Sequence, residues 1–126
     1  MRVIDGDGKE VITARGLHQA AVPEGELDDI PTTPYTPPPF DHAKLLVVVF
    51  SCNHCPYVVG SEERMINFAK EYAPRGVAMI AINSNETEGH PTDSFEHMQQ
   101  RAREKNFPFA YARDDSQEIA LAYGAL

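Results

Sequence analysis

Two cysteines three positions apart are the residues of this sequence best suited to chemistry. Cys52 and Cys55 enclose Asn53 and His54, and Pro56 follows directly. A thiolate, rather than a thiol, is the nucleophile in disulfide exchange, and a free cysteine has a pKa of about 8.5. A positive charge at His54 would favour the thiolate of Cys52 and make the disulfide more oxidising. The spacing therefore predicts a redox dithiol in which Cys52 exchanges with the substrate and Cys55 resolves the mixed disulfide.

Other interpretations of the cysteine pair compete with a redox role. A structural zinc site needs four ligands, and without a second Cys-x-x-Cys it would depend on His18, His42, His90 and His97. Of these, His90 and His97 are otherwise expected to face the solvent. Buried free cysteines often act only as small hydrophobic residues, and haem c attachment needs a histidine where Pro56 stands. The redox dithiol is favoured, with a non-catalytic module that binds a metal or a partner as the alternative.

The elements on either side of the pair explain why the thiols would be reactive. Leu45–Phe50 is continuously apolar and β-branched in its middle, which predicts a strand buried on both faces. A helix is expected from about Asn53 to Ala73, with Cys52 at its start. Free backbone N–H groups and the positive end of the helix dipole stabilise an anion there, and Pro56 is tolerated in the first turn. Cys55, one turn in, is expected to be the less exposed thiol.

The sequence after this helix predicts two further strands. Val77–Ile82 is apolar, and the intervening helix makes it parallel to the first strand through a right-handed crossover. Residues 107–111 can form only an edge strand, because they contain Pro108.

Helical signals occupy the remaining segments of this half. Residues 93–105 predict a helix capped by Thr92, and residues 116–123 predict a third helix after a capping-box pattern. On the first helix, Glu62 and Glu63 are available to the solvent. The order of elements is therefore that of an α/β domain.

Four polar or capping residues are expected to flank the dithiol. Ser51, Asn53 and Pro56 adjoin the cysteines in the sequence. Asn83 follows the second strand at its carboxyl end, where α/β folds place their sites. It either flanks the dithiol or belongs to a polar loop, and the loop is favoured.

The first forty residues differ in kind from the remainder. Arg2–Ala14 predicts a β-hairpin, because Asp-Gly steps supply positive φ between β-branched residues. Six of the chain's ten prolines follow in the next segment, and proline disfavours both helix and central strand. We therefore expect a hairpin at residues 1–15, a Pro-rich linker or arm at 16–40 and an α/β domain at 41–126.

Charge and composition argue against several classes of partner. The 126 residues carry 11 basic and 19 acidic side chains, a net charge of −8, whereas phosphate binding needs clustered Lys and Arg. Nucleic acid and an anionic membrane surface are therefore not expected as partners. The longest apolar run is far short of the roughly 20 residues of a membrane span, and the N-terminus lacks the apolar core of a secretory signal. The expected compartment is the cytoplasm.

The sequence around the dithiol resembles a known family. Phe50–Val58, which reads FSCNHCPYV, is similar to the signature of thioredoxin-like proteins on the alkyl hydroperoxide reductase/thiol-specific antioxidant (redoxin) branch. Similar segments follow at Glu71–Val77, Ala81–Asn85, Asp93–Phe95, Phe107–Phe109 and Ala122–Ala125. The resemblance covers about residues 41–126 and implies a thioredoxin-like fold whose redox pair is Cys52 and Cys55.

The resemblance has further implications for activity and fold. Peroxiredoxins carry Thr or Ser three residues before the peroxidatic cysteine, and Val49 stands there, so a thiol peroxidase is only a further alternative. In the family, a cis-proline loop, a hairpin and a helix follow the segment at which this sequence ends, so the fold is expected to be incomplete at its C-terminus. An uncovered edge on the Leu45–Phe50 strand would promote aggregation, so we expect the Arg2–Thr13 hairpin to pair with it.

The expected function is that of a thiol–disulfide oxidoreductase without an organic or metal cofactor. Cys52 would attack a disulfide and Cys55 would release the product, or the same steps would run in reverse. The expected substrates are protein or small-molecule disulfides and thiols, and a dithiol protein would donate the electrons. The direction depends on the reduction potential of the pair.

Overall fold

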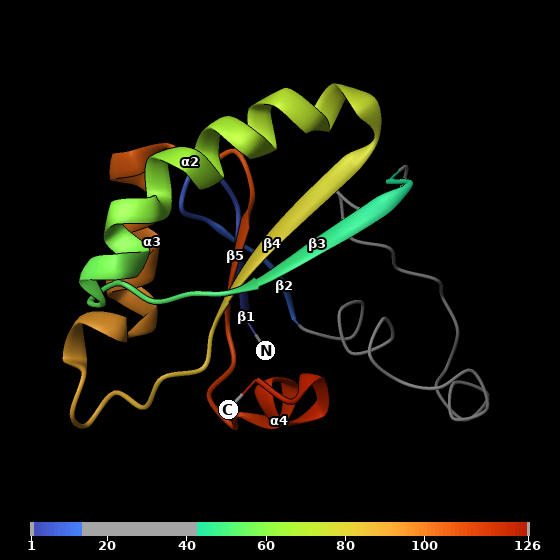
Figure 1. The fold of residues 1–126 in the computed structure, drawn as a ribbon. Coiled ribbons are helices and arrows are strands. Elements are labelled where there is room, and N and C mark those ends of the chain that lie inside the picture. The colour runs from blue at the N-terminus through green and yellow to red at the C-terminus, as the bar shows by residue number, and fades with distance from the viewer. Residues whose placement is uncertain (1, 14–42, 126) are drawn as a thin grey trace.

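The computed structural model of this protein describes residues 2–13 and 43–125. These residues form a five-stranded sheet in the order β2-β1-β5-β4-β3 (Figure 1). The strands are β1 (Arg2–Ile4), β2 (Glu10–Thr13), β3 (Leu45–Phe50), β4 (Val77–Asn83) and β5 (Ala110–Arg113). β3, β4 and β5 are parallel, whereas β1 is antiparallel to both β2 and β5. The predicted Pro-rich arm, residues 16–40, lies outside the described residues, and the predicted division into three segments stays a prediction.

Two apolar clusters on opposite faces hold the helices against the sheet. α2 (Pro56–Tyr72) and α3 (Phe95–Lys105) pack on one face, in a cluster that includes Met79 and Ala81 of β4. α4 (Glu118–Tyr123) packs on the other face, with Ile80 and Ile82 of the same strand (Figure 1). Successive side chains of a strand point to opposite faces, so β4 serves both clusters. This arrangement is the predicted thioredoxin-like α/β architecture. No helix in the described part of the chain is both long enough and apolar enough to cross a bilayer.

β1 and β2 form the predicted hairpin, but it lies at the edge of the sheet opposite to β3. β1 pairs with β5, not with β3, and Val3 lies opposite Ala112. The prediction that the hairpin covers Leu45–Phe50 is therefore wrong. Val3 and Ile4 are almost fully buried, and they extend the α4 cluster and the α2/α3 cluster respectively. The hairpin pairs with β5 because Val3 and Ile4 complete the two apolar clusters there.

β3 is an edge strand within the described sheet. Its ladder with β4 runs from Leu45 opposite Val77 to Phe50 opposite Ile82. Leu45 is 58% exposed, and the rest of the strand is only half-buried. The strand packs against both clusters, as predicted, but its burial is only partial. A strand with a neighbour on one side keeps part of its surface in the solvent.

β5 lies in the interior of the sheet, between β4 and β1, and all four of its residues are buried. The prediction of an edge strand at residues 107–111 is wrong. Pro108 precedes the strand, so its missing N–H removes no hydrogen bond from the ladder. Phe107 and Phe109, on either side of this proline, pack in the α2/α3 cluster.

The helices begin later than predicted. α2 starts at Pro56, with Cys55 as its N-cap. α3 follows a 3-10 turn, η3 (Pro91–Asp93), and its N-cap is Ser94 rather than the predicted Thr92. α4 starts two residues late as well. The first of these shifts leaves both residues between the cysteines in a loop.

An ion pair between α2 and α3 replaces the solvent exposure predicted for Glu62. This carboxylate is buried, and it accepts hydrogen bonds from Nε (2.9 Å) and Nη2 (2.5 Å) of Arg101. The hydrogen bonds that Arg101 donates to Glu62 raise the pKa of Arg101. The pair therefore joins α2 and α3, the two helices that pack on the same face of the sheet.

Replacing Glu62 with glutamine is expected to lower the free energy of unfolding by about 2 kcal/mol, because Arg101 loses a charged acceptor that it meets away from water. Urea unfolding followed by circular dichroism measures the change. Glu63 is exposed on the same turn, so Glu63→Gln is the matched control and is expected to change the value by less than about 0.5 kcal/mol. Equal effects of the two substitutions would contradict a role for the ion pair.

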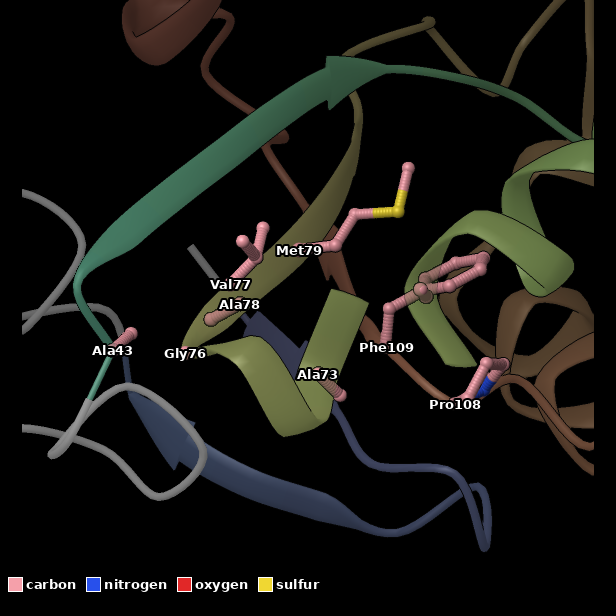
Figure 2. Close-up of a pocket in the computed structure, with 9 residues that line it drawn as sticks. Ala43, Ala73, Gly76, Val77, Ala78, Met79, Pro108 and Phe109 are labelled. Carbon is pink, nitrogen blue, oxygen red and sulfur yellow. The ribbon is translucent and has the colours of Figure 1, made fainter. Parts of the chain in front are cut away.

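A cavity of about 180 Å³ lies at the end of the sheet remote from the cysteines (Figure 2). It is lined by Ala43 before β3, by the end of α2 and the turn that follows it, by the residues before and at the start of β4, and by Pro108 and Phe109. Figure 2 shows mainly small and apolar side chains around it. Because the lining holds neither titratable nor nucleophilic side chains, the candidate site lies elsewhere.

Candidate redox site

The two cysteines lie in the loop between β3 and α2. The N–H of Ser51 donates to the carbonyl of Ile82 (2.8 Å), which extends the β3–β4 pairing to the residue before Cys52. The N–H of Cys55 donates to Sγ of Cys52 over 3.4 Å. Both thiols are free. The loop thus brings the two cysteines into one turn and gives the sulfur of Cys52 a backbone donor.

The exposure of the two thiols is the reverse of that predicted. Cys52 is 7% exposed, whereas Cys55 is only partly buried. The late start of α2 explains the difference, because Cys55 is the N-cap at the end of the helix rather than a residue one turn inside it. Solvent access therefore favours Cys55 as the thiol that exchanges with a substrate, whereas the backbone hydrogen bond favours Cys52 in that role.

A buried carboxylate, Asp93, is the centre of the hydrogen bonds around the loop. Asp93 ends η3 and has no exposed surface. Its Oδ1 accepts from the backbone N–H of Asn53 (2.6 Å) and from the amide of Asn83 (3.1 Å). Its Oδ2 contacts Nδ1 of His54 (2.5 Å) and accepts from the amide of Asn85 (3.1 Å). Both residues between the cysteines are thus bound to one carboxylate.

Two more hydrogen bonds hold Asn53. Its Nδ2 donates to the carbonyl of Thr92 (2.7 Å), and its Oδ1 accepts from the hydroxyl of Tyr111 (2.8 Å). Burial raises the pKa of Tyr111, and the negative charges of Asp93 and Cys52 raise it further, so the hydroxyl keeps its proton. The loop is therefore anchored to η3 and to β5, which are far from it in the sequence.

Asp93 is ionised at neutral pH. Burial alone would raise its pKa, but the hydrogen bonds from Asn53, Asn85, His54 and Asn83 outweigh burial and lower the pKa below its ordinary value of 3.8. A full negative charge therefore lies against the imidazole of His54.

The lowered pKa of Asp93 predicts how stability depends on pH. A carboxyl whose pKa is lower in the folded state stabilises the fold above its unfolded pKa, and this contribution is lost as the pH falls through the folded pKa. Below about pH 4, the free energy of unfolding of the unmodified chain is therefore expected to fall more steeply than that of Asp93→Asn. Urea unfolding from pH 6 to pH 3 measures both, and parallel curves would contradict the expectation.

His90 lies against the face of the His54 ring. The two ring centroids are 4.2 Å apart and the planes differ by 5°. Nε2 of His90 lies 3.9 Å from a carboxylate oxygen of Glu86. His90 is exposed, as predicted, but its contact with the dithiol loop was not predicted.

Cys52, His54 and Asp93 also form a set of possible metal ligands. One ligand atom of each lies within 4.8 Å of the others, and thiolate, imidazole and carboxylate are the ligands that zinc takes. This set differs from the predicted zinc site, which relied on histidines outside the motif. Each oxygen of Asp93 already accepts two hydrogen bonds, which fills the acceptor sites of a carboxylate. The geometry thus favours a hydrogen-bonded network over a metal centre.

The structure brings most of the predicted site residues together around the loop. Three of them, Asn53, His54 and Asn83, bond to Asp93, and the sulfur of Cys52 lies within 4.8 Å of a carboxylate oxygen of Asp93. Cys55 donates to Cys52, whereas Ser51 pairs with β4 and Pro56 begins α2. The favoured interpretation of Asn83 as a loop residue is wrong, because it ends β4 and is fully buried.

Sequence reasoning missed Asp93 and Tyr111, and it favoured a polar loop for Asn85 as for Asn83. Asp93 was expected only as the first residue of a helix. One signal was available, since η3 follows β4 at the same carboxyl edge of the sheet as the dithiol, where α/β folds place their sites.

Comparisons with known proteins agree with this geometry. Residues 18–126 match the family model described as Redoxin. An uncharacterized conserved protein from Geobacillus kaustophilus is similar in structure, with 44% identity, a TM-score of 0.61 and coverage of 63% of this chain and 42% of that chain. A hypothetical protein from Sinorhizobium meliloti 1021 is similar too, with 39% identity, a TM-score of 0.61 and coverage of 63% and 43%. No curated protein gives a significant match.

This chain spans less than half the length of either of these two solved chains. The family match nevertheless extends over most of the chain, including β3, the dithiol loop and α2. It confirms the predicted resemblance to redoxins. The chain therefore belongs to the Redoxin family, which comprises thioredoxin-like peroxiredoxins and thiol oxidoreductases.

Proposed function

We propose that this chain carries out thiol–disulfide exchange through Cys52 and Cys55. The observation that supports this best is the 3.4 Å hydrogen bond from the N–H of Cys55 to Sγ of Cys52. It places two free thiols in a single turn, where they can close into an intramolecular disulfide. It also directs a donor at one sulfur, which favours the thiolate that exchange requires.

Cys52 is the attacking thiol in this proposal, and Cys55 resolves. Cys55 is the more accessible of the two, but access alone does not make a nucleophile, because the thiolate is the reactive form. The sulfur of Cys52 has a backbone donor and lies within 4.8 Å of a His54 ring nitrogen.

The exchange balances in electrons and atoms. The Cys52 thiolate attacks one sulfur of a substrate disulfide, forms a mixed disulfide and expels the other substrate sulfur as a thiolate. The Cys55 thiolate then attacks the Cys52 sulfur, forms the Cys52–Cys55 disulfide and releases the second substrate thiolate. Two electrons pass from the dithiol to the substrate, and a dithiol protein restores them in the reverse manner.

A redox titration of the purified chain tests this function. We expect the Cys52–Cys55 disulfide to form and open reversibly in glutathione or dithiothreitol buffers, at a potential between roughly −120 and −270 mV, the range of known dithiol proteins. Intact mass after alkylation counts the free thiols at each potential. A parallel assay follows the reduction of glutathione disulfide. If no reversible disulfide forms in this range, the proposal fails.

Metal binding is the second candidate, because Cys52, His54 and Asp93 lie within ligand distance of one another. Elemental analysis of the protein, purified without chelators, separates the two functions. Zinc at one equivalent that is lost in the Cys52→Ser variant would favour a metal site. Absence of zinc together with a reversible disulfide would favour exchange.

The partners follow from the same proposal. The substrates are disulfides or thiols of proteins or small molecules, the electron donor is a dithiol protein, and no organic cofactor takes part. A reducing compartment such as the cytoplasm suits this direction of electron flow.

A further inference from the structure

The side chain of Asn53 is held by hydrogen bonds on both sides of its amide, although it lies in the loop between the two cysteines. We propose that Asn53 and Tyr111 form a clamp that keeps Cys52 and Cys55 together and thereby lowers the reduction potential of the pair. The inference rests on the proposed thiol–disulfide exchange. It adds to that function a positioning residue from β5, which is 58 positions away from Asn53 in the sequence.

Three hydrogen bonds make up the clamp. The backbone N–H of Asn53 donates to Oδ1 of Asp93 (2.6 Å), and its Nδ2 donates to the carbonyl of Thr92 (2.7 Å). Its Oδ1 accepts from the hydroxyl of Tyr111 (2.8 Å). An amide oxygen only accepts hydrogen bonds, so turning the amide over would set it against the carbonyl oxygen of Thr92. Asn53 is therefore fixed in one orientation between η3 and β5.

Tyr111 is a rigid anchor for this clamp. The residue is 2% exposed, and its ring packs edge-to-face on Phe107 in the α2/α3 cluster, with 5.5 Å between the ring centroids. Its backbone lies in the interior of the sheet, opposite Ala81 of β4 and Ile4 of β1. A hydrogen bond away from water is stronger than one that water competes for. The core of the protein thus holds the hydroxyl to which the dithiol loop is attached.

The clamped loop brings the two cysteines together while both thiols are free. The N–H of Cys55 lies 3.4 Å from Sγ of Cys52, so this sulfur meets the backbone of its partner before any disulfide forms. Closing a disulfide costs the conformational freedom that the loop still has, and the clamp removes part of that freedom in advance.

This difference decides the direction of the effect. A loop released from the clamp gains freedom as a dithiol but gains little as a disulfide, because the S–S bond restrains it. Loss of the clamp therefore favours the dithiol and raises the reduction potential.

The equilibrium with glutathione measures this effect. The protein dithiol and one glutathione disulfide give the Cys52–Cys55 disulfide and two molecules of glutathione. Two electrons pass from the protein to the glutathione disulfide, and the two thiol protons end on the glutathione thiols. The equilibrium constant of this exchange reports the effective concentration of the two protein thiols for each other. A tenfold change in it corresponds to about 30 mV in the reduction potential.

Tyr111→Phe tests the clamp, because it removes one hydroxyl and keeps the ring. Each variant is equilibrated at neutral pH in glutathione buffers of known ratio, and intact mass after alkylation gives the oxidised fraction. We expect Tyr111→Phe to lower the equilibrium constant about fivefold, which is about 20 mV. Asn53→Ala keeps the backbone bond to Asp93 but loses the other two, and we expect it to lower the constant about tenfold.

A double-mutant cycle separates the clamp from a general effect on packing. Because Tyr111 acts on the dithiol through Asn53, Tyr111→Phe added to Asn53→Ala is expected to change the equilibrium constant by less than about twofold. The matched control is Tyr123→Phe. The Tyr123 ring packs on Phe50 of the dithiol strand, but the hydrogen bonds that hold Asn53 do not involve it, so its variant is expected to keep the parent constant.

Each contrary result overturns the proposal. If Tyr111→Phe leaves the potential unchanged, the hydroxyl only stabilises the fold, which a structural role does equally in both redox states. If it lowers the potential, the clamp opposes the disulfide. If its effect is the same with and without the Asn53 side chain, Tyr111 acts by another route.

Should Tyr111→Phe fail to fold, Asn53→Ala decides, because the clamp requires the equilibrium constant of this loop variant to fall. Failure of the clamp is also distinct from failure of the exchange function. A chain that forms no reversible disulfide at all contradicts the exchange, whereas equal potentials in the parent and the variants contradict the clamp alone.

Discussion

Replacing Cys52 with serine is expected to reduce disulfide reduction by this chain to the rate of the uncatalysed reaction. Serine has the shape of cysteine but no readily formed anion, and the exchange begins with a thiolate. Cys55→Ser is expected to abolish turnover as well, but for another reason. Its Cys52 still attacks, and the mixed disulfide that forms has no resolving thiol.

The two variants are told apart by what accumulates. After incubation with glutathione disulfide, intact mass is expected to show one glutathione adduct on Cys55→Ser and none on Cys52→Ser. The difference in exposure between the two thiols makes this test decisive. Cys55 is the more accessible thiol, so it would form the glutathione adduct if access governed the reaction. An adduct on Cys52→Ser alone would mean that Cys55 is the attacking thiol and Cys52 the resolving one.

The strand that carries the dithiol could be predicted from the sequence, but its place in the sheet could not. The apolar run of Leu45–Phe50 identifies a strand, and a helix followed by a second apolar run implies the parallel pair. Local pattern gives no information about which edge remains open. That outcome depends on Val3 and Ile4, which complete two clusters built from segments more than 40 residues away.

The site shows the same division between local and distant information. Cys52, His54 and Cys55 are recognisable because their chemistry is concentrated in four consecutive positions. Asp93 looks like the first residue of an ordinary helix. Its role appears only when η3 is folded against the loop, 39 and 40 residues away from its partners in the sequence. Pro108 led to a wrong prediction for another reason. Proline is disfavoured within an interior strand, but Pro108 lies before β5 and not within it.

Replacing Ile4 with alanine is expected to lower the free energy of unfolding by about 4 kcal/mol, within the range for deleting a buried isoleucine side chain beyond its β-carbon. Ile4 is fully buried in the α2/α3 cluster, and β1 holds it beside Tyr111 of β5. The hairpin is thus part of the core and not a cover over an edge. Urea unfolding followed by circular dichroism measures the loss.

Leu45→Ala is the matched control, since Leu45 is an apolar strand residue at the opposite edge of the described sheet and is 58% exposed. We expect it to cost less than about 1 kcal/mol, because most of its side chain already meets water. The hairpin position predicted from the sequence alone would require both substitutions to weaken one shared edge. A loss at Leu45 as large as that at Ile4 would therefore contradict the β1–β5 pairing, whereas a large loss at Ile4 alone supports it. Amide exchange adds an independent check, since the N–H groups of β1 and β5 should then exchange together, in the same unfolding event.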